Sequence, residues 1–180
     1  KHAYNHSSTE FIYNGINLEE YPFEKNHTSS NWNDFLFLAK GSWKVKNLKH
    51  CIKACKAAKK HLHIAGGKAI LPSKYNTSYG MVGGDKKVQI LKKCDALLFP
   101  VRWPEPFGIA IIEAMAFGLP VIGSPYGSLP ELIQENVGAI VNNYQELLSI
   151  LKNTPRKYNS QEIRNCLKNK RLGYGIRSFR

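Results

Sequence analysis

The sequence predicts an α/β fold, built as a Rossmann-like, doubly wound parallel sheet. Short apolar runs such as FLFLA (35–39) and ALLFP (96–100) have the character of strands buried on both faces. Segments with apolar residues at helical spacing, such as residues 46–60, separate these runs. This alternation is typical of a parallel sheet with helices on both faces. A chain of 180 residues can form one core of ordinary domain size.

The predicted strands follow one another along the chain. FIYNG (11–15) forms a leading strand, after which the chain up to residue 34 is polar and contains turn formers. Each later strand is a short apolar or β-branched run bounded by glycine, proline or polar residues. These strands are expected over residues 35–39, 61–66, 78–82, 96–100, 120–123 and 138–141.

The predicted helices lie between and after these strands. In residues 46–60, apolar residues recur from Leu48 onward at the spacing of one helix face. Ser128 and Glu131 have the S-x-x-E spacing of a capping box, and Pro130 occupies the first turn, where its missing N–H costs little. Further helices are expected from near Gly84, Phe107 and Ser128, over residues 144–151 and over residues 160–169.

The chain is strongly basic, with 26 lysine and arginine residues against 13 aspartate and glutamate residues and a formal charge of +13. Such a charge is typical of proteins that bind a nucleic acid or an anionic membrane surface. The lysines are spread over predicted helix faces, for example Lys53, Lys56, Lys86 and Lys87, which favours solvated faces. An anionic ligand or membrane surface is the second interpretation. Since no RNA-binding aromatic motif or zinc-finger spacing accompanies the charge, we expect no specific nucleic acid.

The four cysteines are expected to be small buried thiols. Cys51 and Cys55 lie one turn apart on a predicted helix, Cys94 ends another, and no C-x-x-C pair includes Cys166. This pattern favours free thiols over a disulfide framework or a zinc site, and free thiols indicate a reducing compartment. The sequence shows no signal peptide and no apolar run of membrane-spanning length. We therefore expect a cytoplasmic protein, peripheral at the membrane if it binds one.

The motif EPFGIAIIEAMAFG (105–118) is the most informative part of the sequence. It places Glu105 and Glu113 eight residues apart on either side of Gly108, at the predicted start of an apolar helix. The preceding loop, residues 102–107, follows a buried strand and so lies at the carboxyl edge of the sheet, where α/β proteins bind ligands. Gly108 lets the backbone approach a ligand, and the first helical N–H groups can bind a phosphate or sugar oxygen. The alternative is a loop glutamate followed by a solvated helix glutamate.

Extended to Ile122, this segment resembles the E-x7-E signature of retaining glycosyltransferases with the GT-B fold, in particular family 4, the glycosyl transferases group 1. Other segments resemble further motifs of that family and occur in the family's order, together covering roughly residues 11–142. They are YNGIN (13–17), LAKGSWKVKN (38–47), HIAGG (63–67), residues 79–108 and GSLPELI (127–133).

The resemblance implies that the chain is the C-terminal, donor-binding half of a GT-B fold. Residues 1–34 would then form the leading strand and a polar connection, residues 35–151 the Rossmann-like nucleotide-sugar-binding core, and residues 152–180 a basic tail. A complete GT-B enzyme also has an N-terminal acceptor-binding domain, which we expect to be missing from this chain. The fragment alone is therefore expected to bind the donor and to be inactive in sugar transfer.

The resemblance also implies a ligand and the residues that bind it. The donor would be a nucleotide-diphosphate sugar, whose sugar is transferred to an acceptor hydroxyl with retention of configuration and without a metal or other cofactor. Glu113 would bind the ribose hydroxyls, and Glu105 would contact the transferred sugar. Phe107, Gly108 and Ile109 would offer backbone N–H groups to sugar or phosphate oxygens.

Two lysines are implied as positive charge at the departing diphosphate, where fixed charge stabilises the transition state more than the ground state. Lys46 matches the family's lysine in its K-G turn, and Lys40 occupies the place of an arginine. The match is imperfect because the loop is one residue longer and Asn47 replaces the usual glycine. Lys44 is therefore a competing candidate. Val82 lies where family members contact the base through the backbone.

The remaining polar and aromatic residues have less specific interpretations. Arg102 and Trp103 either line the sugar pocket or pack over the loop. His61 and His63 alternate on a predicted strand, which favours a structural role, and the six histidines show no metal-ligand spacing. A GT-B nucleotide-sugar epimerase and a basic nucleic-acid-binding module are the alternative functions at this point.

Overall fold

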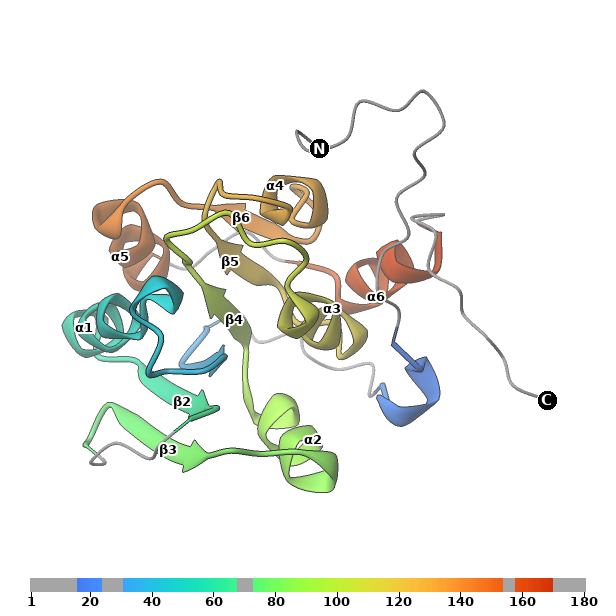
Figure 1. Cartoon of the computed structure of the whole chain (residues 1–180), viewed down its shortest axis with the longest axis horizontal. Helices are drawn as coiled ribbons and strands as arrows, with labels where there is room; N and C mark the ends of the chain where they lie inside the picture. Colours follow the sequence, from blue (N-terminus) through green and yellow to red (C-terminus); the bar gives the residue numbers. More distant parts are fainter. Residues whose placement is uncertain (1–15, 24–30, 68–72, 154–157, 170–180) are drawn as a thin grey trace.

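Six parallel strands form one sheet in the order β3-β2-β1-β4-β5-β6, which is the Rossmann strand order (Figure 1). The computed structural model describes residues 16–23, 31–67, 73–153 and 158–169, so the leading strand expected at residues 11–15 lies outside the described residues. The predicted fold class is confirmed, and each described strand lies within two residues of its predicted bounds. The strands are β1 (Asp34–Leu38), β2 (His61–Ala65), β3 (Asn76–Gly80), β4 (Ala96–Phe99), β5 (Val121–Gly123) and β6 (Gly138–Ile140).

Helices cover both faces of this sheet. On one face α1 and α5 pack side by side, while α2, α3 and α6 cover the other (Figure 1). The sheet is therefore doubly wound, as predicted. The helices are α1 (Leu48–Ala58), α2 (Gly84–Lys93), α3 (Ile109–Ala116), α4 (Leu129–Leu132), α5 (Tyr144–Lys152) and α6 (Ser160–Asn169), with 3₁₀ turns η1 (Leu18–Glu20) and η2 (Lys44–Lys46).

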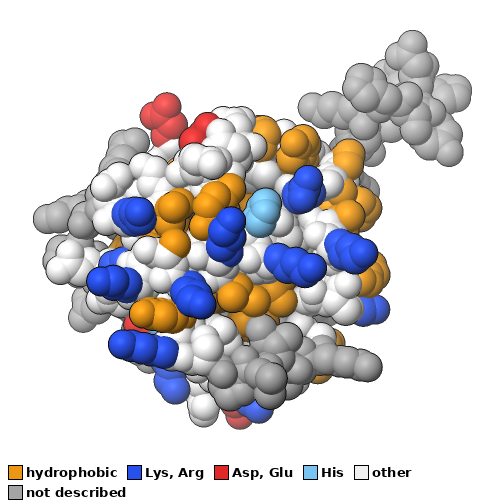
Figure 2. Space-filling view, turned by 90° about the vertical axis from the view of Figure 1, so that its left-hand side faces the viewer, with side chains coloured by type: hydrophobic (Ala, Val, Ile, Leu, Met, Phe, Trp, Pro, Cys, Tyr) orange, Lys and Arg blue, Asp and Glu red, His pale blue; other side chains and the backbone are white. Residues whose placement is uncertain are grey.

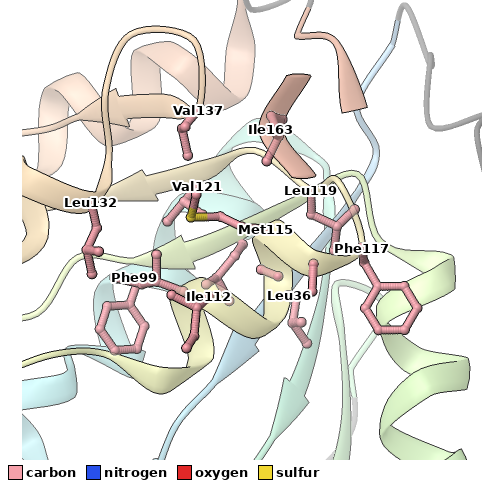
Figure 3. Packing of buried hydrophobic residues seen from close by; sticks show 14 of the residues in the cluster. Leu36, Phe99, Ile112, Met115, Phe117, Leu119, Val121, Leu132, Val137 and Ile163 are labelled. Carbon is pink, nitrogen blue, oxygen red and sulfur yellow. The ribbon is translucent and has the colours of Figure 1, made fainter. Parts of the chain in front are cut away.

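The alternation of side chains along each strand divides the core into two layers. On β1, Leu36 packs in the layer of α2, α3 and α6, while Phe35 and Phe37 pack in the layer of α1 and α5. Figure 3 shows part of the first layer, in which Ile112 and Met115 of α3 pack over the sheet. Because both faces are covered, the strands are continuous apolar runs. The core thereby fixes α3, the helix of the E-x7-E motif.

The predicted capping box at α4 is wrong. Ser128 has helical backbone angles (φ −80°, ψ −8°), and its side chain makes no cap hydrogen bond. Its hydroxyl instead donates to the carbonyl of Phe107 at 3.1 Å. Since α4 is a single turn between two loops, a tertiary contact replaces the local one. Ser128 thereby ties this loop to the residues just before α3.

The cysteine environments agree with the predicted buried thiols. Cys51, Cys55 and Cys94 are buried, Cys166 is half-buried, and all four are free. Burial raises the pKa of the Cys51 thiol well above its ordinary value and raises that of Cys55 to about 12. Both thiols therefore stay protonated at neutral pH, where a thiol is a poor nucleophile and a poor metal ligand.

Basic side chains are spread over the surface of the molecule. Figure 2 shows one side, where lysine and arginine side chains lie separately among hydrophobic and neutral ones. Lys53 and Lys56 of α1 and Lys86 of α2 are exposed, as predicted for solvated helix faces. In the part of the chain that the structure describes, no helix is long and apolar enough to span a membrane.

Candidate functional site

Two adjoining pockets open at the carboxyl edge of the sheet, beside the loop between β4 and α3. We name each after the glutamate that lines it. The Glu113 pocket has a volume of about 670 Å³ and extends to Gly67 and Val82, after β2 and β3. The Glu105 pocket has a volume of about 440 Å³ and extends to Lys46. The residues common to both pockets are Leu38, Ala39, Lys40, Ile109 and Ala110.

Glu105 is nearly buried in its pocket, with 8% of its surface exposed. Its Oε2 accepts a hydrogen bond of 2.8 Å from Trp103 Nε1 and forms an ion pair with Lys46 Nζ. The Lys46 ammonium also lies 5.2 Å from the centroid of the Trp103 ring and 5.3 Å from that of Phe99. These ring faces attract the cation while the carboxylate balances its charge. The structure thus brings together Glu105 and Lys46, which are 59 residues apart in the sequence.

The backbone of Glu105 is fixed by the loop before α4. The N–H of Ser128 donates to the Glu105 carbonyl at 2.9 Å. Gly127 has a φ of +65° and packs against the backbone of Glu105 so closely that a Cβ would overlap it. This position therefore requires glycine, both for its backbone angle and for the close approach.

Glu113 is held by two residues from other parts of the chain, Tyr21 after η1 and Lys87 of α2. Its Oε1 accepts a hydrogen bond of 2.8 Å from the Tyr21 hydroxyl and lies 2.6 Å from Lys87 Nζ. Burial, and then the Glu113 carboxylate, raise the pKa of Tyr21, so its hydroxyl keeps the proton that it donates. The predicted solvation of Lys87 is wrong, because α2 directs this lysine toward α3 and leaves its side chain 22% exposed. Glu113 itself is 9% exposed, which excludes the alternative of a solvated helix glutamate.

The start of α3 lies between the two carboxylates. Gly108 is the N-cap residue and has left-handed angles (φ +80°, ψ +64°), while a Cβ there would lie 2.9 Å from Ile111 Cδ1. Phe107 is 8% exposed and packs into the core, whereas Ile109 is 50% exposed. The N–H groups of Ile109 and Ala110 have no acceptor within the helix. Because both residues line both pockets, these donors are available where the pockets meet.

The other predicted contacts differ in how well the structure supports them. Lys40 is exposed, lines both pockets and has its ammonium 5.1 Å from the centroid of the Trp43 ring. Lys44 lines neither pocket, so the competing assignment to Lys44 has no geometric support. Val82 is half-buried in the wall of the Glu113 pocket, next to Met81, which is 78% exposed.

Asn47 lies in the loop after β1, at the position where the resemblance predicts a glycine. Its backbone is left-handed (φ +64°, ψ +31°), a conformation that asparagine adopts more readily than most other side chains. Its Nδ2 donates to the Pro100 carbonyl at 2.9 Å, and the Arg102 N–H donates to the Val45 carbonyl at 2.7 Å. These bonds join the loop after β1 to the loop after β4, which brings Lys46 to Glu105.

Arg102 and Trp103 lie in different environments. Trp103 lines the Glu105 pocket, as one of its two interpretations predicted. Arg102 does not line the Glu105 pocket, since it lines a separate cavity of about 260 Å³ together with His50 and Tyr144. The position of Arg102 follows from its backbone, whose N–H donates to the loop after β1.

The strand histidines bind neighbouring strands, in agreement with their predicted structural role. His61 Nε2 lies 2.9 Å from Thr77 Oγ1. His63 Nε2 lies 2.9 Å from Asp34 Oδ1, and its Nδ1 lies 2.8 Å from the Tyr79 hydroxyl. Among the described residues, no group of three His, Cys, Asp or Glu side chains is arranged to hold a metal ion.

Two residues of this site carry no recognisable signal in the sequence. Tyr21 lies in the polar connection, 92 residues before the glutamate that it contacts. Lys87 is one of several lysines on predicted helices, and only the packing of α2 against the sheet distinguishes it from Lys86. Trp103 does have a local signal, since it lies two residues before Glu105.

A family model confirms the assignment that the motifs suggested. The model of the glycosyl transferases group 1 matches residues 20–161. The chain belongs to this family. Over 61 residues the chain is 43% identical to the uncharacterized glycosyltransferase MJ1607 of Methanocaldococcus jannaschii, covering 34% of this chain and 15% of that protein. Over 74 residues it is 32% identical to an uncharacterized 41.2 kDa protein in the cps region of Klebsiella pneumoniae, covering 41% of this chain and 20% of that protein.

Solved glycosyltransferases share the fold. AviGT4, a glycosyltransferase involved in avilamycin A biosynthesis, superimposes with a TM-score of 0.73 at 22% identity, covering 95% of this chain and 55% of that one. Anabaena HepE in complex with UDP gives a TM-score of 0.70 at 20% identity, covering 88% and 52%. The chain therefore spans about half the length of these structures. Its Rossmann-like domain is of the GT-B type.

Proposed function

We propose that this chain is the donor-binding domain of a retaining glycosyltransferase of family 4, which transfers a sugar from a nucleotide-diphosphate sugar to an acceptor hydroxyl. The observation that carries the proposal is the separation of Glu105 and Glu113 into adjoining pockets with the start of α3 between them. The parts of a nucleotide sugar follow the same order as these features. Its ribose would lie at Glu113, its diphosphate at the start of α3 and its sugar at Glu105. Helix N-termini are suited to the diphosphate.

The Glu113 pocket suits the nucleoside. Its walls include Leu38, Met81 and Val82, which offer apolar surface to a base, and one carboxylate, which can accept hydrogen bonds from both ribose hydroxyls. In this proposal the backbone at Val82 contacts the base. HepE has been crystallised with UDP and with UDP-glucose, so uridine donors are the first to test.

The junction of the two pockets suits the diphosphate. Lys40 lines both pockets, as do Ile109 and Ala110 with their free helical N–H groups. When the bond from the anomeric carbon to the diphosphate breaks, negative charge grows on the departing oxygen, and these donors stabilise it. Lys46 contributes positive charge from the sugar side, where its ion pair with Glu105 also balances that carboxylate.

Transfer with retention needs no nucleophile from this chain. The acceptor oxygen forms a bond to the anomeric carbon on the face that the diphosphate leaves, and its proton passes to an oxygen of the departing phosphate. Glu105 would orient the sugar hydroxyls during this exchange. The acceptor-binding surface would come from a second domain, so the proposal predicts donor binding without transfer for this chain alone.

Calorimetric titration with UDP-, GDP- and ADP-sugars tests the proposal. One base should be preferred, and Glu113→Ala should weaken the nucleoside diphosphate and the nucleotide sugar alike by about tenfold or more, because both contain the ribose. Unchanged affinities in a folded Glu113→Ala variant would contradict the ribose assignment. Salt-sensitive RNA binding without any nucleotide binding would favour the nucleic-acid alternative. Release of free sugar without acceptor by a full-length protein would favour the epimerase alternative.

A further inference from the structure

The two glutamates of the motif are held in the same way by different residues. Glu105 receives an uncharged N–H donor, Trp103 Nε1, and a lysine ammonium on one oxygen, Oε2. Glu113 likewise receives an uncharged O–H donor, Tyr21, and a lysine ammonium on one oxygen, Oε1. In each case the protein occupies one carboxylate oxygen and lines a pocket with the rest of the side chain.

The second oxygen of each carboxylate has no protein partner among the described residues. Glu105 and Glu113 keep 10% and 12% of their side chains exposed, although both residues are otherwise buried. A carboxylate oxygen has two lone-pair sites, so one free oxygen suffices for two hydroxyl donors. The neutral donors fix the orientation of each carboxylate, while the lysine on the same oxygen balances its charge.

We propose that Tyr21 and Trp103 are positioning residues, which turn the free oxygen of Glu113 toward the ribose and the free oxygen of Glu105 toward the transferred sugar. The inference rests on the proposed function and deepens it. It assigns a separate hydrogen-bond donor to the glutamate at each end of the ligand. Tyr21 should therefore affect every ligand that contains the ribose, and Trp103 only the contribution of the sugar.

Tyr21 is itself fixed from the opposite end of the chain. Arg164 of α6 donates to the carbonyls of Tyr21 at 2.8 Å and of Leu18 at 3.2 Å, and it also binds the carbonyl of Ala116 in the last turn of α3. The Tyr21 ring meets Phe117 edge to face, with centroids 5.7 Å apart. The backbone and ring of Tyr21 are thereby anchored to the C-terminal end of α3, the helix that carries Glu113.

Tyr21→Phe removes only the hydroxyl that donates to Glu113, whereas Trp103→Phe removes the N–H that donates to Glu105 together with one ring of the indole. Tyr21→Phe keeps the ring against Phe117 and Lys87, and Trp103→Phe keeps a ring beside Lys46, so both should fold. We would titrate each variant with UDP and UDP-glucose, or with the pair that the donor screen selects. Tyr21→Phe should weaken both ligands equally, by about three- to tenfold. Trp103→Phe should leave the diphosphate within about twofold and reduce the extra affinity given by the sugar about three- to tenfold.

A double-mutant cycle separates positioning from general destabilisation. In a Glu113→Ala background, Tyr21→Phe should no longer change affinity, because the side chain that accepts the Tyr21 hydrogen bond is gone. Additive losses in that background, or unchanged affinities in folded single variants, would overturn the inference. If wild-type protein binds no nucleotide, or Glu113→Ala has no effect, the proposed function fails instead.

Discussion

At the scale of single residues, Lys46 and Glu105 depend on each other for charge balance. Both are nearly buried, with 9% and 8% of their surfaces exposed. Removing one partner of a buried pair leaves an uncompensated charge, which typically costs about 3–5 kcal/mol. Lys46→Met should therefore lower the free energy of unfolding by about this amount in urea denaturation. The double variant Lys46→Met/Glu105→Gln should recover most of the loss, and a double variant less stable than Lys46→Met would contradict this dependence.

Glu105→Gln is expected to separate sugar recognition from nucleotide recognition. The amide keeps the size of the side chain but removes the charge that faces Lys46 and the Glu105 pocket. Affinity for the nucleoside diphosphate should stay within about twofold, while the extra affinity given by the sugar should fall about tenfold. In a full-length enzyme, turnover should fall strongly. If the bare diphosphate and the nucleotide sugar lost equal affinity, the division of the site between Glu105 and Glu113 would be wrong.

At the scale of elements, the loop before α4 controls the loop that carries Glu105. Gly127→Ala would force a side chain into the Glu105 backbone at a left-handed φ of +65°, which costs about 1–3 kcal/mol in strain alone. The variant should unfold at a lower temperature and lose sugar-dependent affinity. Gly83→Ala is the matched control, because nothing lies within 4 Å of its added Cβ and its φ is −152°. Equal behaviour of the two variants would contradict the role of Gly127.

The elements were largely predictable because their signals are local. β1 and β4 are apolar runs, and α1 has a regular apolar face, so burial and periodicity specify them without knowledge of the fold. The capping box at Ser128 failed because a one-turn helix gives little reason for a local bond when a tertiary acceptor, the carbonyl of Phe107, is near. Local patterns predict a contact correctly only when no distant partner competes for the same group.

At the scale of the whole molecule, the site was predictable only in part. The motif located Glu105, Gly108 and Glu113 because the carboxyl edge of a parallel sheet is a general ligand site. The donor to Glu113 was not predictable, since Tyr21 reaches that glutamate across 92 residues, whereas Trp103 lies only two residues before Glu105. Arg164 in turn joins the connection before β1 to α6, and burial lowers its pKa. Residues from both ends of the described chain therefore stabilise the site, although neither end contains a motif for it.

The stability of the whole molecule should depend on pH through His63. Burial, together with His61 and Lys93, lowers the pKa of His63 below its ordinary value, although Asp34 opposes this shift. Neutral His63 can donate from Nε2 to Asp34 and accept from the Tyr79 hydroxyl at Nδ1, which satisfies both ring nitrogens. The unfolded chain therefore binds a proton more readily at this position than the folded one.

This difference fixes the sign of the pH dependence. Above about pH 6.5, His63 is neutral in both states and contributes no dependence. As the pH falls below that value, the unfolded state gains a proton first, so the free energy of unfolding should fall until the folded-state pKa is passed. Each tenfold difference in proton affinity is worth about 1.4 kcal/mol. Urea denaturation at about pH 7 and about pH 5 measures the effect. His63→Gln should show a smaller decrease, and an equal decrease in both proteins would assign the dependence to other groups.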